Sequence, residues 1–511
     1  MKRFLVIALL SALAISAGCV FHRVQVQPVV PRDAVTVTSP VKAHLKDGST
    51  VVYAKGVTVS GGTLRGAGVR YDLALKQPAN VDNIPLDSVV GMESFQTRVD
   101  GAKTAIVTTL VTAGAIVGGA ALAVAIFGSC PTVYSDDGAV EEAELFSNSI
   151  APLFEARDVD RLRAQPDANG ILRLELRNEA METHYINHLQ IFEVPHAADE
   201  FVLPDTQDHP VVVRGIQTPA GITNRSGQDL HATLSAADGK FYRTDRHFID
   251  SASVDDMDDG IDFTAAVPDG ARSTTLIFRL RNSLLTTTLL YDEMLAPAGA
   301  RAIDWLGPGL ARISSAVELG RWRERRAGLH ISVWRDGAYR EVVRIPDSGP
   351  ITWHDVAAVI PAQQGETSLR IRLSFLADQW RIDRVGVASA EREAAPRVIQ
   401  ISEVTGSDGS PENTARDSMS APDDRYLQTN PGQRFFVGFN VGQTPAGKSR
   451  TFLLSSQGYY TEWIRGAWIQ AASAKEPFRP TDEALLAALR RWAATREPFE
   501  ERFVKDRVPV H

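Results

Sequence analysis

Residues 368–388 read SLRIRLSFLADQWRIDRVGVA and alternate apolar with polar side chains along two successive strands. Alternation of this kind is typical of strands that bury one face. Four more strand-like stretches lie between residues 273 and 361, namely STTLIFRLRN, GLHISVWRDG, YREVVRIP and ITWHDVAAVIP. Strands and turns at this spacing predict a β-sandwich over residues 224–390, of the jelly-roll kind. The segments at 286–306 and 313–326 predict a helical insertion within it.

The rest of the chain is also predicted to be rich in strands, so the fold class is mainly β and multidomain. The other predicted units are a small antiparallel β domain at 31–100, a β-rich domain at 131–215, a β unit at 396–470 and a C-terminal helix at 480–503. The acidic segment 141–158, EEAELFSNSIAPLFEARD, is predicted to be helix-like. Thr481 is the expected N-cap of the C-terminal helix.

The first 19 residues have the order of a secretory signal: basic residues, an apolar run and then small residues that end at Cys19. The small residues before Cys19 resemble the lipobox of bacterial lipoproteins, although Ser16 stands where that family prefers Leu, Val or Ile. The resemblance implies a lipid-modified Cys19, and Val20 after it, in place of Asp, implies the outer membrane rather than the inner. Ordinary cleavage and an uncleaved anchor are the alternatives.

A second uncharged apolar stretch covers residues 104–127 and is long enough to cross a bilayer as a helix. Gly114 and Gly118 form a GxxxG motif, and Gly119 continues a pattern of small residues that lets membrane helices pack closely. We expect one continuous helix, which either associates with a membrane or packs against other protein. The alternative is two short hairpin strands divided at Gly118 and Gly119.

Charge and cysteine content exclude two classes of protein. A net charge of −8 argues against a nucleic-acid surface, because phosphate binding needs clustered Lys and Arg. Two cysteines cannot form a disulfide scaffold, and Cys130 has no partner if Cys19 carries lipid.

All eight tryptophans lie at or after Trp305, which indicates a separate C-terminal core. Aromatic rings with a polar edge stack well on sugars. The candidates for such a glycan platform are Trp322, Trp334, Trp353 and Trp380. Burial in the sandwich core is the alternative reading of the same residues.

The loop SVDDMDDGIDF gathers carboxylates of the kind that calcium prefers. The candidate ligands are Asp255, Asp256, Asp258, Asp259 and Asp262. Met257 breaks the EF-hand spacing, so the choice is between a sandwich-type calcium site and a solvated acidic loop. His184 and His188 lie in a strand-like segment and are too far apart to share one ion. Nucleophile elbow, phosphate-loop, dinucleotide and Cys-x-x-Cys motifs are all absent from the sequence, so we expect no enzyme.

Three segments resemble bacterial exported proteins of uncharacterised families: NEAMETHYINHLQIFEV at 178–194, RLSFLADQWRIDRV at 372–385 and GKSRTFLLSSQGYYTEW at 447–463. The last is also similar to C-terminal regions of ASPIC/UnbV (CRTAC-like) extracellular proteins. The resemblance implies exported β-rich modules and assigns no site residues.

Together these features predict a non-enzymatic, membrane-anchored lipoprotein of the cell envelope whose β-sandwich modules bind a glycan or a protein. One alternative is a structural subunit of an envelope assembly that uses the Gly-rich apolar helix. Another is a hydrolase with a dispersed site.

Overall fold

The computed structural model describes the chain from Arg23 to Val510, apart from residues 29–34, 39–40, 46–48, 54, 72–78, 99–130, 148, 151–153, 181, 302–320, 323, 445–446, 464–480 and 506–509. The predicted signal at 1–19 with Cys19 lies outside the described residues. So do Cys130 and the predicted helix at 104–127, with Gly114, Gly118 and Gly119. None of the helices formed by the described residues has both the length and the apolar character needed to cross a bilayer.

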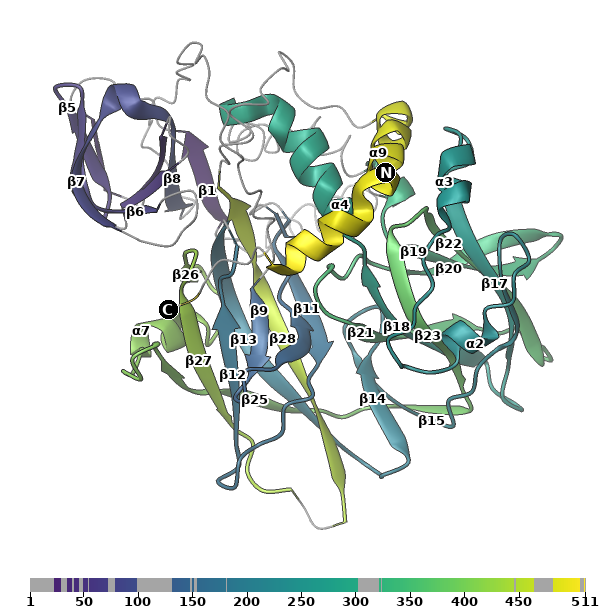
Figure 1. Ribbon diagram of the computed structural model, residues 1–511. Coiled ribbons are helices and arrows are strands. Elements are labelled where there is room, and N and C mark those ends of the chain that lie inside the picture. The colour runs from purple at the N-terminus through teal and green to yellow at the C-terminus, as the bar shows by residue number, and fades with distance from the viewer. Residues whose placement is uncertain are drawn as a thin grey trace, which may run out of the picture.

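The described part of the chain is mainly β and forms several separate sheets, which confirms the predicted fold class (Figure 1). The N-terminal sheet curls around its own apolar core. Its strands are β1 (Arg23–Pro28), β2 (Val35–Val37), β3 (Val41–Leu45), β4 (Thr50–Tyr53), β5 (Val57–Ser60), β6 (Thr63–Tyr71), β7 (Ala79–Pro85) and β8 (Val89–Arg98), with the short helix η1 (Leu86–Ser88). Gly61 and Gly62 have φ of 56° and 70° and join β5 to β6. Positive φ at both residues of a two-residue loop is what a tight hairpin requires.

A nine-stranded sheet folds over on itself to form a middle sandwich. Its elements are β9 (Thr132–Ser135), β10 (Val140–Glu144), β11 (Ala156–Arg161), β12 (Ile171–Arg177), β13 (Glu182–His196), β25 (Arg397–Thr405), α7 (Asn413–Ser418), β26 (Leu427–Thr429), β27 (Arg434–Asn440) and β28 (Ser449–Glu462). The first half of β25 pairs with β13 and the second half with β27, so this strand carries the sheet around the fold. The enclosed core is apolar and draws on both parts of the chain.

The middle sandwich joins two ranges that the sequence analysis treats as separate units, 131–215 and 396–470. Strand β12 pairs with β27 along its whole length, and β13 pairs with β28 over fourteen registered positions. Local patterning predicts the individual strands. It carries no signal for pairing across more than two hundred intervening residues.

A second sandwich lies between these two ranges and has the strand order of a jelly roll. Its strands are β16 (Ala220–Asn224), β17 (Asp258–Ala266), β18 (Ser273–Asn282), β19 (Leu329–Arg335), β20 (Ala338–Ile345), β21 (His354–Pro361), β22 (Ser368–Leu376) and β23 (Trp380–Ala388), with short helices α2 (His231–Leu234) and α3 (Arg246–Ser251). One sheet has the order β16-β17-β22-β19-β20 and the other β21-β18-β23, so the chain repeatedly crosses from sheet to sheet. The alternating apolar residues of 368–388 point into the core between them.

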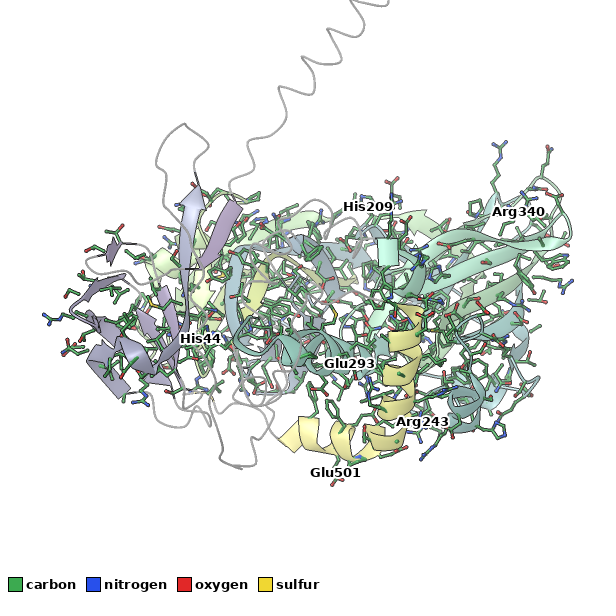
Figure 2. The ribbon with its side chains drawn as sticks, turned by 90° about the horizontal axis from the view of Figure 1, so that it is seen from above. His44, His209, Arg243, Glu293, Arg340 and Glu501 are labelled. Atoms are coloured by element: carbon green, nitrogen blue, oxygen red, sulfur yellow. The ribbon has the colours of Figure 1, made fainter. Side chains whose placement is uncertain are left out.

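Further elements connect and cover the two sandwiches. They are a small sheet of β14 (Glu200–Pro204), β15 (Pro210–Arg214) and β24 (Ala390–Glu393), the insertion α4 (Leu285–Thr288), η3 (Leu289–Leu295) and η4 (Ala296–Arg301), and the C-terminal helix α9 (Asp482–Lys505). Helix α9 packs its apolar face on the insertion and on the jelly roll. Arg491 of α9 pairs with Glu293 of the insertion at 2.6 Å, and both Glu293 and Arg243 lie beside α9 (Figure 2). Thr481 Oγ1 caps the helix by accepting from the amide of Ala484.

Candidate functional site

A cavity of about 130 Å³ lies where the middle sandwich, the jelly roll and the helical insertion meet. Each of the three parts contributes to its wall. The middle sandwich supplies Glu144 and Tyr460, the jelly roll supplies Asn282 and Gln379, and the insertion supplies Leu290 and Met294. The site therefore exists only when all three parts are assembled.

Glu144, the last residue of β10, is fully buried at this junction. Its Oε2 accepts hydrogen bonds from the amides of Ile351 at 2.9 Å and Thr352 at 3.3 Å, which ties the middle sandwich to the jelly roll. Its Oε1 has no hydrogen-bond partner among the described residues. Burial raises the pKa of Glu144 to about 7, because the charged carboxylate is poorly solvated.

Gly349 makes room for this carboxylate. A Cβ on Gly349 would lie 2.6 Å from Glu144 Oε1 and 2.4 Å from Ser147 Oγ, and the backbone φ of +94° is unfavourable for other residues. Gly349, Glu144 and Ser147 all line the cavity. The absence of a side chain at this position thus keeps Glu144 Oε1 unobstructed.

Two more polar atoms of the wall, Gln379 Oε1 and Trp322 Nε1, are buried and have no partner within the described part of the chain. Gln379 is held in place because its Nε2 donates to Asp347 Oδ1 at 2.7 Å. Asn282 Nδ2 donates to the same oxygen, and Asn282 Oδ1 accepts from the amides of Ser348 and Gly349. A buried polar atom without a partner costs about 1–3 kcal/mol, which makes three around one cavity a sign of a ligand or bound water.

The wall also has an apolar part. It consists of Ile150, Phe154, Leu289, Leu290, Met294 and Leu376. The cavity therefore joins a polar side, formed by the two sandwiches, to an apolar side formed largely by the insertion. Ligand sites commonly combine a mostly apolar lining with a few placed polar groups.

A buried chain of hydrogen bonds lies behind Glu144. His354 Nδ1 is 2.6 Å from Asp160 Oδ1, and His354 Nε2 is 3.1 Å from Thr352 Oγ1. Burial alone would lower the pKa of His354, but the charge and hydrogen bond of Asp160, with smaller contributions from Asp158 and Glu144, raise it to about 9. A protonated His354 donates through both nitrogens, so it cannot act as a general base on Thr352. The arrangement therefore acts as a cross-link between β11 and β21.

The structure does not bring the four predicted platform tryptophans together. Trp380 is fully buried in the jelly-roll core. Trp353 packs against Phe241, with the ring centroids 5.7 Å apart. Trp322 lines the junction cavity. Trp334 is 38% exposed on the outer face of β19, where Tyr339 lies edge-on to it at 5.0 Å.

The predicted calcium ligands point to separate partners. Three of them form ion pairs with different arginines: Asp262 with Arg372, Asp258 with Arg326 and Asp256 with Arg225. The buried Asp259 accepts hydrogen bonds from the hydroxyls of Tyr242 and Thr244. Asp255 is exposed. Across the described residues, no three His, Cys, Asp or Glu side chains gather as a metal site would require.

The buried His184 is hydrogen-bonded to Glu182 and Thr429. Burial lowers the pKa of His184 to about 3, because the protonated imidazole is poorly solvated. His188, on the same strand, is half-buried.

Sequence reasoning missed the junction site. The prediction that residues 141–158 are helix-like is wrong at Glu144, because residues 140–144 form a strand that pairs with β9. The alternation of burial along β10 is too short to outweigh the helix-favouring Glu and Ala content. Gln379 and Gly349 carry no motif at all. No protein-family model matches this chain, and no curated protein sequence is significantly similar to it.

Proposed function

We propose that this chain is an exported, lipid-anchored envelope protein that binds a small ligand in the cavity at the junction of its two sandwiches. The observation that carries the ligand site is Glu144 Oε1, a fully buried carboxylate oxygen without a hydrogen-bond partner among the described residues, on the cavity wall. The signal-like N-terminus and the lipobox-like Cys19 support the anchor.

Native mass spectrometry of the full-length protein, extracted from envelope membranes in mild detergent, tests ligand binding. We expect a co-purified small molecule on the wild-type protein. The substitution Thr287→Trp fills the cavity from its half-buried rim and should abolish the adduct. The control Thr495→Trp, on the exposed face of α9, should keep it. A wild-type protein that carries no molecule, and that no small molecule stabilises against heat, would rule the proposal out.

The anchor is tested separately by labelling cells with a fatty-acid probe. The wild-type protein should incorporate the label and fractionate with the outer membrane. The variant Cys19→Ala should do neither. Labelling that survives this substitution contradicts the lipoprotein assignment.

Glycan binding is a second candidate, and Trp334 favours it. Its ring is exposed beside Tyr339 on the outer face of the five-stranded sheet, and the guanidinium of Arg370 lies 5.0 Å from the ring centroid. An aromatic ring flanked by polar side chains is a common support for sugar rings.

A further inference from the structure

The volume of the junction cavity limits the size of its ligand. A cavity of about 130 Å³ is close to the roughly 150 Å³ that accommodates benzene in an engineered protein core. The enclosed part of the ligand is therefore a compact molecule, or a compact end group, about the size of one benzene ring. The apolar side of the wall calls for a hydrocarbon body.

The free polar atoms on the wall accept more hydrogen bonds than they donate. Glu144 Oε1 and Gln379 Oε1 are acceptors, and Trp322 Nε1 is the one donor without a partner among the described lining residues. Gln379 cannot turn its amide toward the cavity without losing the bond from its Nε2 to Asp347. A ligand that matches this wall must therefore bring hydrogen-bond donors.

Carboxylates outnumber cations among the charged groups on the described wall. Apart from tyrosine hydroxyls, the ionisable groups on the described wall are Glu144, Asp347 and Arg326. Arg326 is already matched by Asp482 and Asp258, which lie outside the cavity lining. Two cations interact with Glu144 from outside the cavity lining: His354 is paired with Asp160, and Arg281 donates to the carbonyl of Pro350 at 2.6 Å. Glu144 Oε1 nevertheless keeps no hydrogen-bond partner among the described residues.

We infer that the cavity selects a small primary ammonium compound with an apolar body, and that Glu144 Oε1 is its counter-ion. This inference rests on the proposed ligand-binding function. An ammonium group carries three donors, which suits the free acceptors Glu144 Oε1 and Gln379 Oε1. The insertion then covers the hydrocarbon part.

Three probes of nearly equal shape test the assignment on the full-length protein in detergent: benzylamine, benzyl alcohol and toluene. Calorimetric titration at pH 8 should give a dissociation constant at least tenfold lower for benzylamine than for benzyl alcohol, with toluene weakest. The near-isosteric variant Glu144→Gln should weaken benzylamine at least tenfold and leave toluene unchanged. The matched control Glu483→Gln removes an exposed carboxylate from α9 and should change nothing.

The outcomes separate the ligand class from the site. If the three probes bind equally, or if the alcohol or toluene binds more tightly than the amine, the ammonium assignment is overturned while a ligand-binding cavity remains. The same holds if Glu144→Gln keeps the preference for benzylamine. Should Glu144→Gln fail to fold, the comparison of probes on the wild-type protein still decides. If no probe binds and no molecule co-purifies, the proposed function itself fails.

Discussion

The interior of the jelly roll and the junction between the two sandwiches are both buried, but the jelly-roll interior is apolar whereas the junction also contains charged side chains. The jelly-roll core is formed by apolar residues from both sheets, with Trp380 fully enclosed. The junction contains ionisable groups, among them Arg279, which contacts Glu142 at 2.7 Å and Asp355 at 3.4 Å. Apolar burial is non-directional, whereas paired charges need one geometry. The core therefore stabilises the sandwich, and the junction sets how the two sandwiches meet.

The largest effect is expected from Trp380→Ala. Removing a fully buried tryptophan should lower the free energy of unfolding by about 3–5 kcal/mol, because it deletes apolar contacts and leaves a cavity. Urea denaturation followed by circular dichroism measures the change. A loss below about 1 kcal/mol would contradict the assignment of Trp380 to the core.

The junction, unlike the core, should respond to pH. The pKa of His354 is raised from 6.5 to about 9, so its protonation stabilises the fold below about pH 6.5, and this stabilisation is lost as the pH rises through about 9. The pKa of Glu144 is raised from 4.5 to about 7, so protonation of Glu144 also stabilises the fold, and this stabilisation is lost as the pH rises through about 7. We expect the free energy of unfolding to fall by on the order of 2 kcal/mol between pH 6.5 and 9. Urea unfolding at several pH values measures it, and His354→Gln should flatten the profile. A profile that is level in the wild-type protein would disprove this role.

A smaller effect at the junction comes from Gly349→Ala. The new methyl group would collide with Glu144 and Ser147 and should also block the cavity. Gly365→Ala is a matched control, because Gly365 has φ +87° but nothing within 4 Å of the added Cβ. Both variants carry backbone strain, so we expect Gly349→Ala to lose about 1–2 kcal/mol more than the control. Equal melting temperatures for the two variants would show that the contact with Glu144 is not close.

The smallest stability change is expected for Trp334→Ala, which removes a tryptophan from the same sandwich as Trp380 but from its exposed face. We expect less than about 0.5 kcal/mol, since exposed substitutions rarely cost more. If the glycan proposal holds, the same variant should lose binding on a glycan array. Unchanged binding by a protein that does recognise glycans would place the sugar elsewhere.

The strands of the jelly roll could be predicted from the sequence, because apolar and polar residues alternate regularly within each strand. Leu369, Ile371 and Leu373 all face the core, as the period of two predicts. The middle sandwich could not be predicted as one unit, because its main strand pairs join residues more than two hundred positions apart in the sequence.

The junction site was hidden for a different reason. Glu144, Gly349 and Gln379 are ordinary residues whose importance comes from where three separate segments meet. The free oxygen of Glu144 depends on the amides that occupy its other oxygen and on the missing side chain of Gly349. No sequence motif predicts either of these two features.

The pairing of β12 and β13 with β27 and β28 has a consequence for biosynthesis. The chain is synthesised from its N-terminus, so all strands of the jelly roll are made before β27 and β28. During that interval the edges of β12 and β13 are open, and open strand edges are templates for aggregation. We therefore expect the yield to depend on a chaperone that shields these edges, or on rapid completion of the last hundred residues. A nonsense mutation near residue 395 should therefore give insoluble protein even though every jelly-roll strand has been made.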